Sequence, residues 1–252
     1  MPAPRPARRP GGRERPNQKG ESMKSTRLQE ARQTLARVGE MMLRRNLTDL
    51  AGGNISARVA DRIVMSPTLA GTERFWQLEP EEVLVLDLQG NKLEGQGDLS
   101  RETPTHVALL NHFYPAGQAV IHAHPRNTLV FCVGGQAMLP VLEGVLELKE
   151  VKMVEYAHGG VQSERLAQNV LEGLVGQEEL MGRSAAVVMA PWHGVFGVGK
   201  DLYSVLETID RIENNAYCIL MSKLLFSDPA ELEHHRRDLL EAVRSPGAES
   251  GG

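Results

Sequence analysis

Two long helical segments enclose a series of short strand-like segments, and this order limits the possible folds more than any other feature of the chain. Residues 25–45 and 201–225 both carry apolar side chains at helical spacing, with charged residues between them. The first β-prone runs between them are Ile55–Val59, Arg62–Ser66, Val83–Leu88 and Ala119–His124. Helices that alternate with short strands, some joined by hairpins, predict an α/β domain with a mixed or mainly antiparallel sheet flanked by helices.

The remaining elements are expected from caps and periodicity. A helix over Glu102–Phe113 would begin with Ser100 as its N-cap and Pro104 in its first turn. The other expected segments are a helix over 126–134, a strand over 149–156, a helix capped by Ser163, a strand over 184–191 with its hairpin partner 194–199, and a charged helix over 229–243. Because no linker interrupts these elements, residues 25–244 are expected to form one domain.

Both ends of the chain differ from this domain in composition. Residues 1–22 hold six Arg or Lys and two Glu among Pro and Gly. Such a segment buries too little surface to offset its ordering entropy, so residues 1–24 are expected to be a disordered basic arm. An upstream start codon, with Met23 as the true first residue, is an alternative origin for this segment. Residues 245–252 are expected to be a flexible tail.

The overall composition argues against several classes of protein. A net charge of −4 favours neither nucleic acid nor a membrane as a partner and is compatible with a small polar ligand. Cys132 and Cys218 lie far apart in apolar stretches, which indicates reduced thiols in a reducing compartment. No apolar run approaches the roughly 20 residues of a membrane helix, and no signal-like segment is present. We therefore expect a cytoplasmic protein.

The sequence VIHAHP, residues 120–125, suggests a metal site. Residues i and i+2 of a strand share a face, so His122 and His124 are expected to project together. Two imidazoles leave a divalent cation half coordinated, so a third ligand is needed. The candidates are His106, His112, His158, His193, His234 and His235. His193 fits best, because it lies just past the end of a buried strand, where sheet proteins assemble sites.

An acid/base group is expected near these histidines. Glu102 lies at the start of a helix, whose N-terminus favours its negative charge, and the strand bearing the two histidines follows closely. Glu94 and Asp98 are alternatives, but they lie in a Gly-rich hairpin region without such support. His106 follows Glu102 by one helical turn, so a packing or supporting role is expected for it.

Five ordered motifs resemble the class II aldolase and adducin-domain family. They are AGGNIS, SPT with a nearby glycine, SRETPTHVALL, VIHAHP and WHGVFGVG, and the similarity covers about Leu28 to Leu225. The resemblance implies a three-layer α/β/α sandwich around a mainly antiparallel sheet, assembled as a homotetramer. It also implies Zn²⁺ bound by three histidines, here His122, His124 and His193, with Glu102 as the acid/base.

The resemblance further implies a substrate phosphate bound by glycine-rich loops. The residues in question are Gly53, Asn54, Ser66, Thr68 and Ser100. Arg101 stands where many members have a second serine; it either binds a phosphate or carboxylate bidentately or points to solvent. Fuculose-phosphate aldolases also place a tyrosine after a proline in the segment that follows the H-x-H helix. Here Glu143 and Gly144 occupy that vicinity, and Tyr156 is the first tyrosine beyond.

The preferred function is a zinc-dependent aldolase. It would cleave a sugar phosphate, a ketose 1-phosphate, into dihydroxyacetone phosphate and a small aldehyde. Three neutral ligands leave the charge of the metal undiminished, and this charge stabilises the enediolate that cleavage produces. A 4-epimerase, dehydratase or decarboxylase would use the same site. A non-catalytic adducin-like module and a cupin-like barrel are further alternatives, opposed by the retained ligands and by the long helices respectively.

Overall fold

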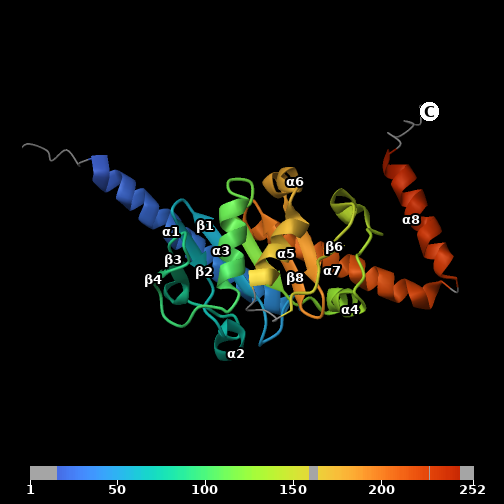
Figure 1. Cartoon of the computed structure of the whole chain (residues 1–252), viewed down its shortest axis with the longest axis horizontal. Coiled ribbons are helices and arrows are strands. Elements are labelled where there is room, and N and C mark those ends of the chain that lie inside the picture. The colour runs from blue at the N-terminus through green and yellow to red at the C-terminus, as the bar shows by residue number, and fades with distance from the viewer. Residues whose placement is uncertain (1–15, 159–163, 227, 245–252) are drawn as a thin grey trace, which may run out of the picture.

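The computed structural model of the chain describes residues 16–158, 164–226 and 228–244. Within these ranges an eight-stranded sheet has the order β4-β3-β2-β1-β5-β8-β7-β6 (Figure 1). Its strands are β1 (Asn54–Val59), β2 (Arg62–Met65), β3 (Leu84–Leu86), β4 (Lys92–Glu94), β5 (Ala119–Ala123), β6 (Lys152–Met153), β7 (Ala185–Ala190) and β8 (Gly194–Gly199). Only β6 and β7 are parallel neighbours in the described sheet. The predicted, mainly antiparallel sheet is therefore confirmed.

Helices cover both faces of this sheet. The long helices α1 (Pro16–Arg44) and α7 (Leu202–Leu225) pack on one face, and α3 (Thr103–His112) and α5 (Glu164–Leu174) pack on the other (Figure 1). The shorter elements are α2 (Ala70–Arg74), η1 (Pro80–Glu82), α4 (Arg126–Gly134), η2 (Glu143–Leu148), α6 (Glu178–Arg183) and α8 (Pro229–Arg244). The three-layer α/β/α fold predicted from the sequence is confirmed. No helix in the described ranges has the length and apolar character to cross a membrane.

The central strands are buried on both faces, which explains their continuous apolar sequences. Every residue of β5, β7 and β8 is buried. The glycines of β8 let α7 approach the sheet closely, because a Cβ at Gly197 would lie 2.7 Å from Cγ1 of Val205. Asp201 caps α7 by accepting a hydrogen bond from the backbone N–H of Ser204 at 2.8 Å, so the helix begins directly after β8.

Two helices begin at residues other than those predicted. Helix α1 begins at Pro16, nine residues before the expected start, so residues 16–24 are helical although the sequence assigned them to a disordered arm. Proline is compatible with a first helical turn because its missing N–H is not needed there. The expected N-cap Ser100 is also wrong, because α3 begins at Thr103 and Glu102 holds the N-cap position. The expectations for residues 1–15, for Ser163 and for residues 245–252 lie outside the described ranges.

Short peripheral elements account for most of the other differences. Strand β4 was not predicted because all three of its residues are exposed and carry no hydrophobic pattern. Helices α2 and α6 span only five and six residues, too few to show a helical period. The strand expected over 149–156 contracts to the two residues of β6, which pair with β7 at the edge of the sheet.

Candidate metal centre

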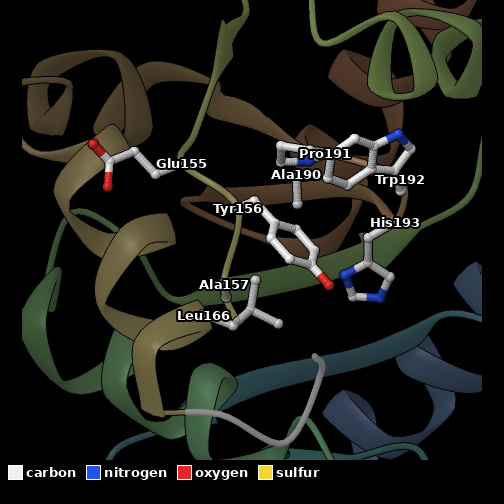
Figure 2. Close-up of a pocket in the computed structure, with 8 residues that line it drawn as sticks. All are labelled: Glu155, Tyr156, Ala157, Leu166, Ala190, Pro191, Trp192 and His193. Carbon is white, nitrogen blue, oxygen red and sulfur yellow. The ribbon is translucent and has the colours of Figure 1, made fainter. Parts of the chain in front are cut away.

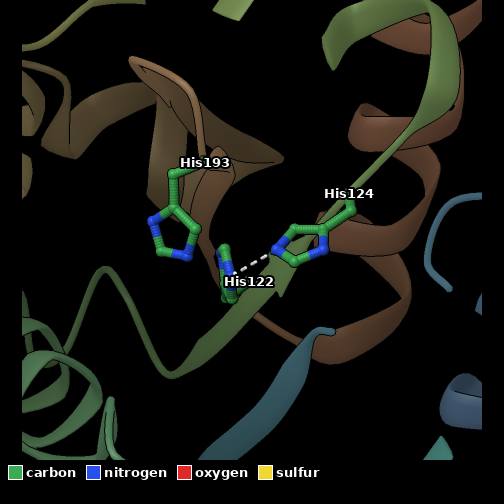
Figure 3. Close-up of side chains that lie close together, drawn as sticks. All are labelled: His122, His124 and His193. Atoms are coloured by element: carbon green, nitrogen blue, oxygen red, sulfur yellow. Dashed lines mark hydrogen bonds between the residues drawn. The ribbon is translucent and has the colours of Figure 1, made fainter. Parts of the chain in front are cut away.

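Three histidines meet where β5 ends and β8 begins. These strands pair antiparallel, with His122 opposite Phe196, so the end of one lies beside the start of the other. His122 lies in β5, His124 follows it directly, and His193 ends the turn that leads into β8. One ring nitrogen from each side chain lies within 4.8 Å of the other two, and Figure 3 shows the rings converging. The structure thus brings together the three histidines predicted from the sequence.

Hydrogen bonds on the outer side of two rings determine which nitrogen remains free. Nδ1–H of His122 donates to the backbone oxygen of Val195 at 2.9 Å, and Nδ1–H of His124 donates to Oδ2 of Asp49 at 3.1 Å. In the neutral rings both Nε2 atoms are then unprotonated, and they lie 3.0 Å apart (Figure 3). A cation that both lone pairs contact relieves their repulsion, so this donor set fits a divalent metal.

Burial keeps His122 in the form that binds metal. The side chain is 1% exposed, and this burial lowers the pKa of the imidazole well below its ordinary value, although the nearby Glu102 carboxylate opposes the shift. The ring is therefore neutral near pH 7, as a metal ligand must be.

Glu102 places a carboxylate beside the three imidazoles. Its Oε1 lies 3.2 Å from Nε2 of His193, and its Oε2 lies 3.4 Å from Nε2 of His122. The amide Nδ2 of Asn54 donates to Oε2 at 2.6 Å. Burial alone would raise the pKa of this carboxyl, but His122, His193 and Asn54 hold it well below its usual range. Oε1 is buried and accepts no hydrogen bond of good geometry from the described residues, so it is free to contact a ligand.

Gly52 and Gly194 have no side chain in the space that the ring of His124 occupies. A Cβ at Gly52 would lie 2.1 Å from Nδ1 of His124. A Cβ at Gly194 would lie 2.4 Å from the backbone oxygen of Ala123 and 2.7 Å from Cδ2 of His124. Any larger residue at either position would therefore displace His124, which gives the AGGN and WHGV sequences a structural reason.

A polar cavity opens on one side of the histidines. Nine of the ten site residues predicted from the sequence line it: Gly53, Asn54, Thr68, Ser100, Arg101, Glu102, His122, His124 and His193. Ser66 does not. Its side chain is fully buried, and its Oγ accepts a hydrogen bond from the backbone N–H of Ile55 at 3.1 Å. The expectation that Ser66 contacts a phosphate is therefore corrected, because this hydroxyl completes the end of the β1–β2 pairing.

Asp49 is a site residue that the sequence did not reveal. It orients His124 and also accepts hydrogen bonds from the backbone N–H groups of Ala51 and Gly52, at 2.8 and 2.6 Å. Partial burial opposes its charge, but these bonds hold the pKa of Asp49 below its ordinary value. The only signal in the sequence is an aspartate placed before a glycine pair, which is common in ordinary turns.

His106 packs against β1 beside the site and is not among the three histidines that converge. It is fully buried on α3, and its Nδ1 lies 2.6 Å from Oγ of Ser56 on β1. Its Nε2 has no hydrogen-bond partner among the described residues. This position agrees with the packing role expected from its spacing to Glu102.

Three imidazoles and a carboxylate at one end of a mainly antiparallel sheet, within three α/β/α layers, define an α/β domain whose donor set could hold a divalent metal ion. The chain belongs to the class II aldolase and adducin family, because residues 33–220 match the domain described as Class II Aldolase and Adducin N-terminal domain. The family resemblance seen in the sequence motifs is thereby confirmed.

Individual relatives carry out different reactions. An L-fuculose phosphate aldolase of Methanocaldococcus jannaschii is 27% identical over 176 residues, which are 69% of this chain and 87% of that protein. A methylthioribulose-1-phosphate dehydratase of Pseudoalteromonas translucida is 26% identical over 188 residues, 71% of this chain and 85% of the relative. A solved L-fuculose 1-phosphate aldolase superposes with a TM-score of 0.67 at 21% identity, covering 83% of this chain and 96% of its own, which supports the fold.

Proposed function

We propose that this protein is a zinc-dependent aldolase that cleaves a ketose 1-phosphate into dihydroxyacetone phosphate and a small aldehyde. The observation that carries the proposal is the position of Glu102. Its buried carboxylate lies 3.2 Å from His193 and 3.4 Å from His122, with one oxygen that accepts no hydrogen bond from the described residues. The similarity to a sugar-phosphate aldolase and a sugar-phosphate dehydratase supports the choice of substrate class.

Different residues of the chain serve different parts of the proposed reaction. Cleavage of a carbon–carbon bond beside a ketone leaves an enediolate, whose negative charge a bound divalent cation would stabilise. Val195 and Asp49 hold the rings of His122 and His124 in the orientation that points both Nε2 atoms inward. Glu102 accepts a proton from the substrate at Oε1 and returns it after cleavage.

The substrate phosphate is assigned to the polar cavity. Gly53, Asn54, Thr68 and Ser100 line it with backbone and small polar groups, and Arg101 adds a guanidinium. Arg101 is exposed and lies next to Glu102, so its side chain has the reach to bind a phosphate bidentately.

Dehydration of a sugar phosphate is a second candidate. The dehydratase relative matches this chain at nearly the same identity as the aldolase relative, 26% against 27%. Aldol cleavage requires removal of the proton of the hydroxyl group β to the carbonyl, and dehydration requires removal of a proton from the carbon next to the carbonyl, so the same carboxylate would serve as the base in either reaction.

Metal analysis followed by a substrate screen tests the proposal. Elemental analysis of the purified protein is expected to find one zinc per chain. Ketose 1-phosphates are then incubated with the protein, and both dihydroxyacetone phosphate and free aldehyde are measured. Equal amounts of the two products support aldol cleavage, whereas a dehydrated product that keeps all its carbons supports the second candidate. A metal-free protein that converts none of the compounds after zinc is added would refute both.

A further inference from the structure

A cavity separate from the metal centre lies at the opposite end of β1. The cavity drawn in Figure 2 has His193 in its lining and therefore adjoins the candidate centre. The separate cavity has a volume of about 420 Å³ and is formed by α1, the turn between β1 and β2, and β4. Val59 at the end of β1 lines it, whereas Asn54 at the start of β1 contacts Glu102. Because a strand rises roughly 3.3 Å per residue, about 16 Å of β1 separate the two positions.

Positive charge predominates in this basic cavity. Its charged lining residues are the cations Lys24, Arg27, Arg32 and Arg62 and the carboxylates Asp61 and Glu94. The resulting excess of positive charge contrasts with the net charge of −4 that the whole chain carries. A concave surface with one predominant sign of charge concentrates ions of the opposite sign. The ligand that fits this cavity is therefore an anion.

The two carboxylates engage only some of the cationic donors. Asp61 pairs with Lys24 at 3.6 Å and with Arg62 at 3.1 Å. All three of these side chains are exposed, and exposed ion pairs contribute little free energy, so an anion can compete with Asp61 for both cations. Arg27 is exposed and forms no ion pair or hydrogen bond with another residue of the described ranges. Its guanidinium is therefore available to a ligand.

Arg32 distinguishes this cavity from an ordinary solvated basic surface, because its side chain is only 12% exposed. Its Nη2 donates to Oε2 of Glu94 at 2.8 Å. Its Nε is buried and has no hydrogen-bond partner within the part of the chain that the structure describes. A buried donor without an acceptor is unfavourable. Because Arg32 lines the basic cavity, an anion bound there would supply the missing acceptor.

The cations that α1 contributes lie outside the domain shared with the aldolase family. Lys24, Arg27 and Arg32 all precede residue 33, where the match to the family domain begins. They lie on the part of α1 that passes beside the β1–β4 half of the sheet (Figure 1). None of the residues that line the basic cavity lines either of the cavities at the metal centre. Its role is therefore independent of the proposed cleavage reaction.

We propose that the basic cavity binds the phosphate group of a small phosphorylated molecule. Arg27 and the Nε–H of Arg32 donate to the phosphate oxygens, and Lys24 adds its positive charge. A guanidinium presents parallel N–H donors that match two phosphate oxygens, and a phosphate has enough oxygens to engage several cations at once. The volume of the cavity leaves room beside the phosphate, where Leu28 and Val59 offer apolar contact to the rest of the molecule.

Equilibrium dialysis of the purified protein against radiolabelled inorganic phosphate tests the proposal. Sodium chloride is present at about 0.15 M, because this concentration screens exposed charges that lie more than about 8 Å apart. Arg27→Glu is expected to weaken the binding of one phosphate per chain by about tenfold or more, since it replaces a charge-assisted contact with a repulsive charge. Arg27 has no partner in the described ranges, so the fold is expected to remain, and an unchanged circular dichroism spectrum verifies this.

Arg37→Glu is the matched control. Arg37 is also exposed on α1 but does not line the basic cavity, so the same change of charge is expected to leave phosphate binding unchanged. Equal losses in the two variants would mean that phosphate responds only to the total charge, which would overturn the proposal. It would also be overturned if the wild-type protein bound no phosphate, or if Arg27→Glu bound phosphate as tightly as the wild type.

Two further variants locate the bound phosphate. Arg32→Lys retains the positive charge beside Glu94 but has no Nε–H, so its affinity for phosphate is expected to fall about tenfold, the scale of one hydrogen bond to a charged group. Wild-type affinity in this variant would contradict the contact assigned to Arg32 and overturn the proposal. Arg101→Gln alters the polar cavity instead and is expected to retain the phosphate that Arg27→Glu loses. If Arg101→Gln abolished all phosphate binding, the phosphate would lie only at the metal centre and the proposal would fail.

Discussion

The Asp49 carboxylate accepts a hydrogen bond from Nδ1 of His124 at 3.1 Å, although the two residues are 75 positions apart in the chain. This bond fixes the tautomer of His124 and aims its Nε2 at the centre. The substitution Asp49→Ala is expected to weaken zinc binding by about 10- to 100-fold, the usual range for such outer partners of ligand histidines. Competition with a chelator of known affinity measures the loss.

Asp49→Asn is the matched variant for this prediction. Asp49 accepts from His124 on one oxygen and from Ala51 and Gly52 on the other, so the single side-chain oxygen of asparagine can keep only one of these two sets, and it carries no negative charge. An affinity between those of the wild type and Asp49→Ala is therefore expected. If Asp49→Ala bound zinc as tightly as the wild type, Asp49 would have no role in orienting the ligand.

Glu102→Gln is expected to separate metal binding from turnover. The amide is nearly the same size as the carboxylate, so the three histidines and one zinc per chain are expected to remain. The turnover number is expected to fall by about 10² to 10⁴, the usual contribution of an acid/base group. Glu94→Gln is the control, because Glu94 was one of the two competing candidates and pairs with Arg32 at 2.8 Å on the exposed strand β4. Wild-type activity in Glu102→Gln would remove the assigned role.

Gly194→Ala is expected to disrupt the metal centre. The added Cβ would lie 2.4 Å from the carbonyl oxygen of Ala123 and 2.7 Å from the ring of His124, so that ring must move. Zinc content after dialysis is expected to fall well below one per chain. Gly182→Ala is the control, since a Cβ there meets nothing within 4 Å and the position is helical. That variant is expected to keep its zinc and to gain about 0.5–1 kcal/mol in stability.

The sequence predicted the parts of the site that local geometry determines. The period of two along β5 places His122 and His124 on one face, and the end of a buried strand marks His193. Asp49 was missed because its contact with His124 depends on how two distant segments pack. The assignment of Ser66 to the substrate phosphate was wrong because the direction of its side chain follows from the β1–β2 pairing. There its Oγ accepts a hydrogen bond from the backbone N–H of Ile55. Neither relationship has a local pattern.

The elements of the fold that have a local sequence pattern were also predicted, whereas the contacts between distant segments were not. Long amphipathic segments gave α7 and most of α1, and fully apolar runs gave β5, β7 and β8. The ring contact between Tyr156 and Trp192 was not predicted, because it joins the segment after β6 to the β7–β8 turn. Contacts of this kind depend on tertiary packing, which the spacing of residues does not encode.

Glu213 is expected to be a major contributor to stability. It lies on α7 and is 9% exposed, and its carboxylate accepts four hydrogen bonds of 2.8–2.9 Å from the backbone and side chains of Asn127 and Thr128. These donors form the first turn of α4, directly after His124 and Pro125. Glu213→Gln would turn an amide N–H₂ toward some of these donors, so a loss of about 2–3 kcal/mol in the free energy of unfolding is expected.

Urea denaturation measures this loss against a surface control. Glu207→Gln alters a carboxylate on the same helix that pairs with Arg211 in solvent, where ion pairs contribute little. Its effect is expected to stay within about 0.5 kcal/mol. If the two variants were equally stable, the network around Glu213 would contribute nothing beyond a surface pair.

His106 is expected to make stability depend on pH. Its complete burial lowers the pKa of the imidazole to about 4, from an ordinary value of 6.5, although the Glu102 carboxylate opposes the shift. The unfolded chain therefore takes up a proton below about pH 6.5, whereas the folded chain does so only near pH 4. The contribution of the neutral ring is complete above about pH 6.5 and is lost as the pH falls through this window. A shift of this size corresponds to about 3 kcal/mol.

Comparison with His106→Gln isolates this contribution, because glutamine does not titrate. Urea denaturation of both proteins in the presence of a chelator, at several pH values between 4.5 and 7.5, gives the free energy of unfolding without the influence of bound metal. The wild-type value is expected to fall more steeply with decreasing pH, by up to about 1.4 kcal/mol per unit, which is the slope for one proton. Other titrating groups, including His122, affect both proteins alike and cancel in the difference. Parallel curves would mean that His106 binds its proton equally in the folded and unfolded chains, which contradicts its burial against Ser56.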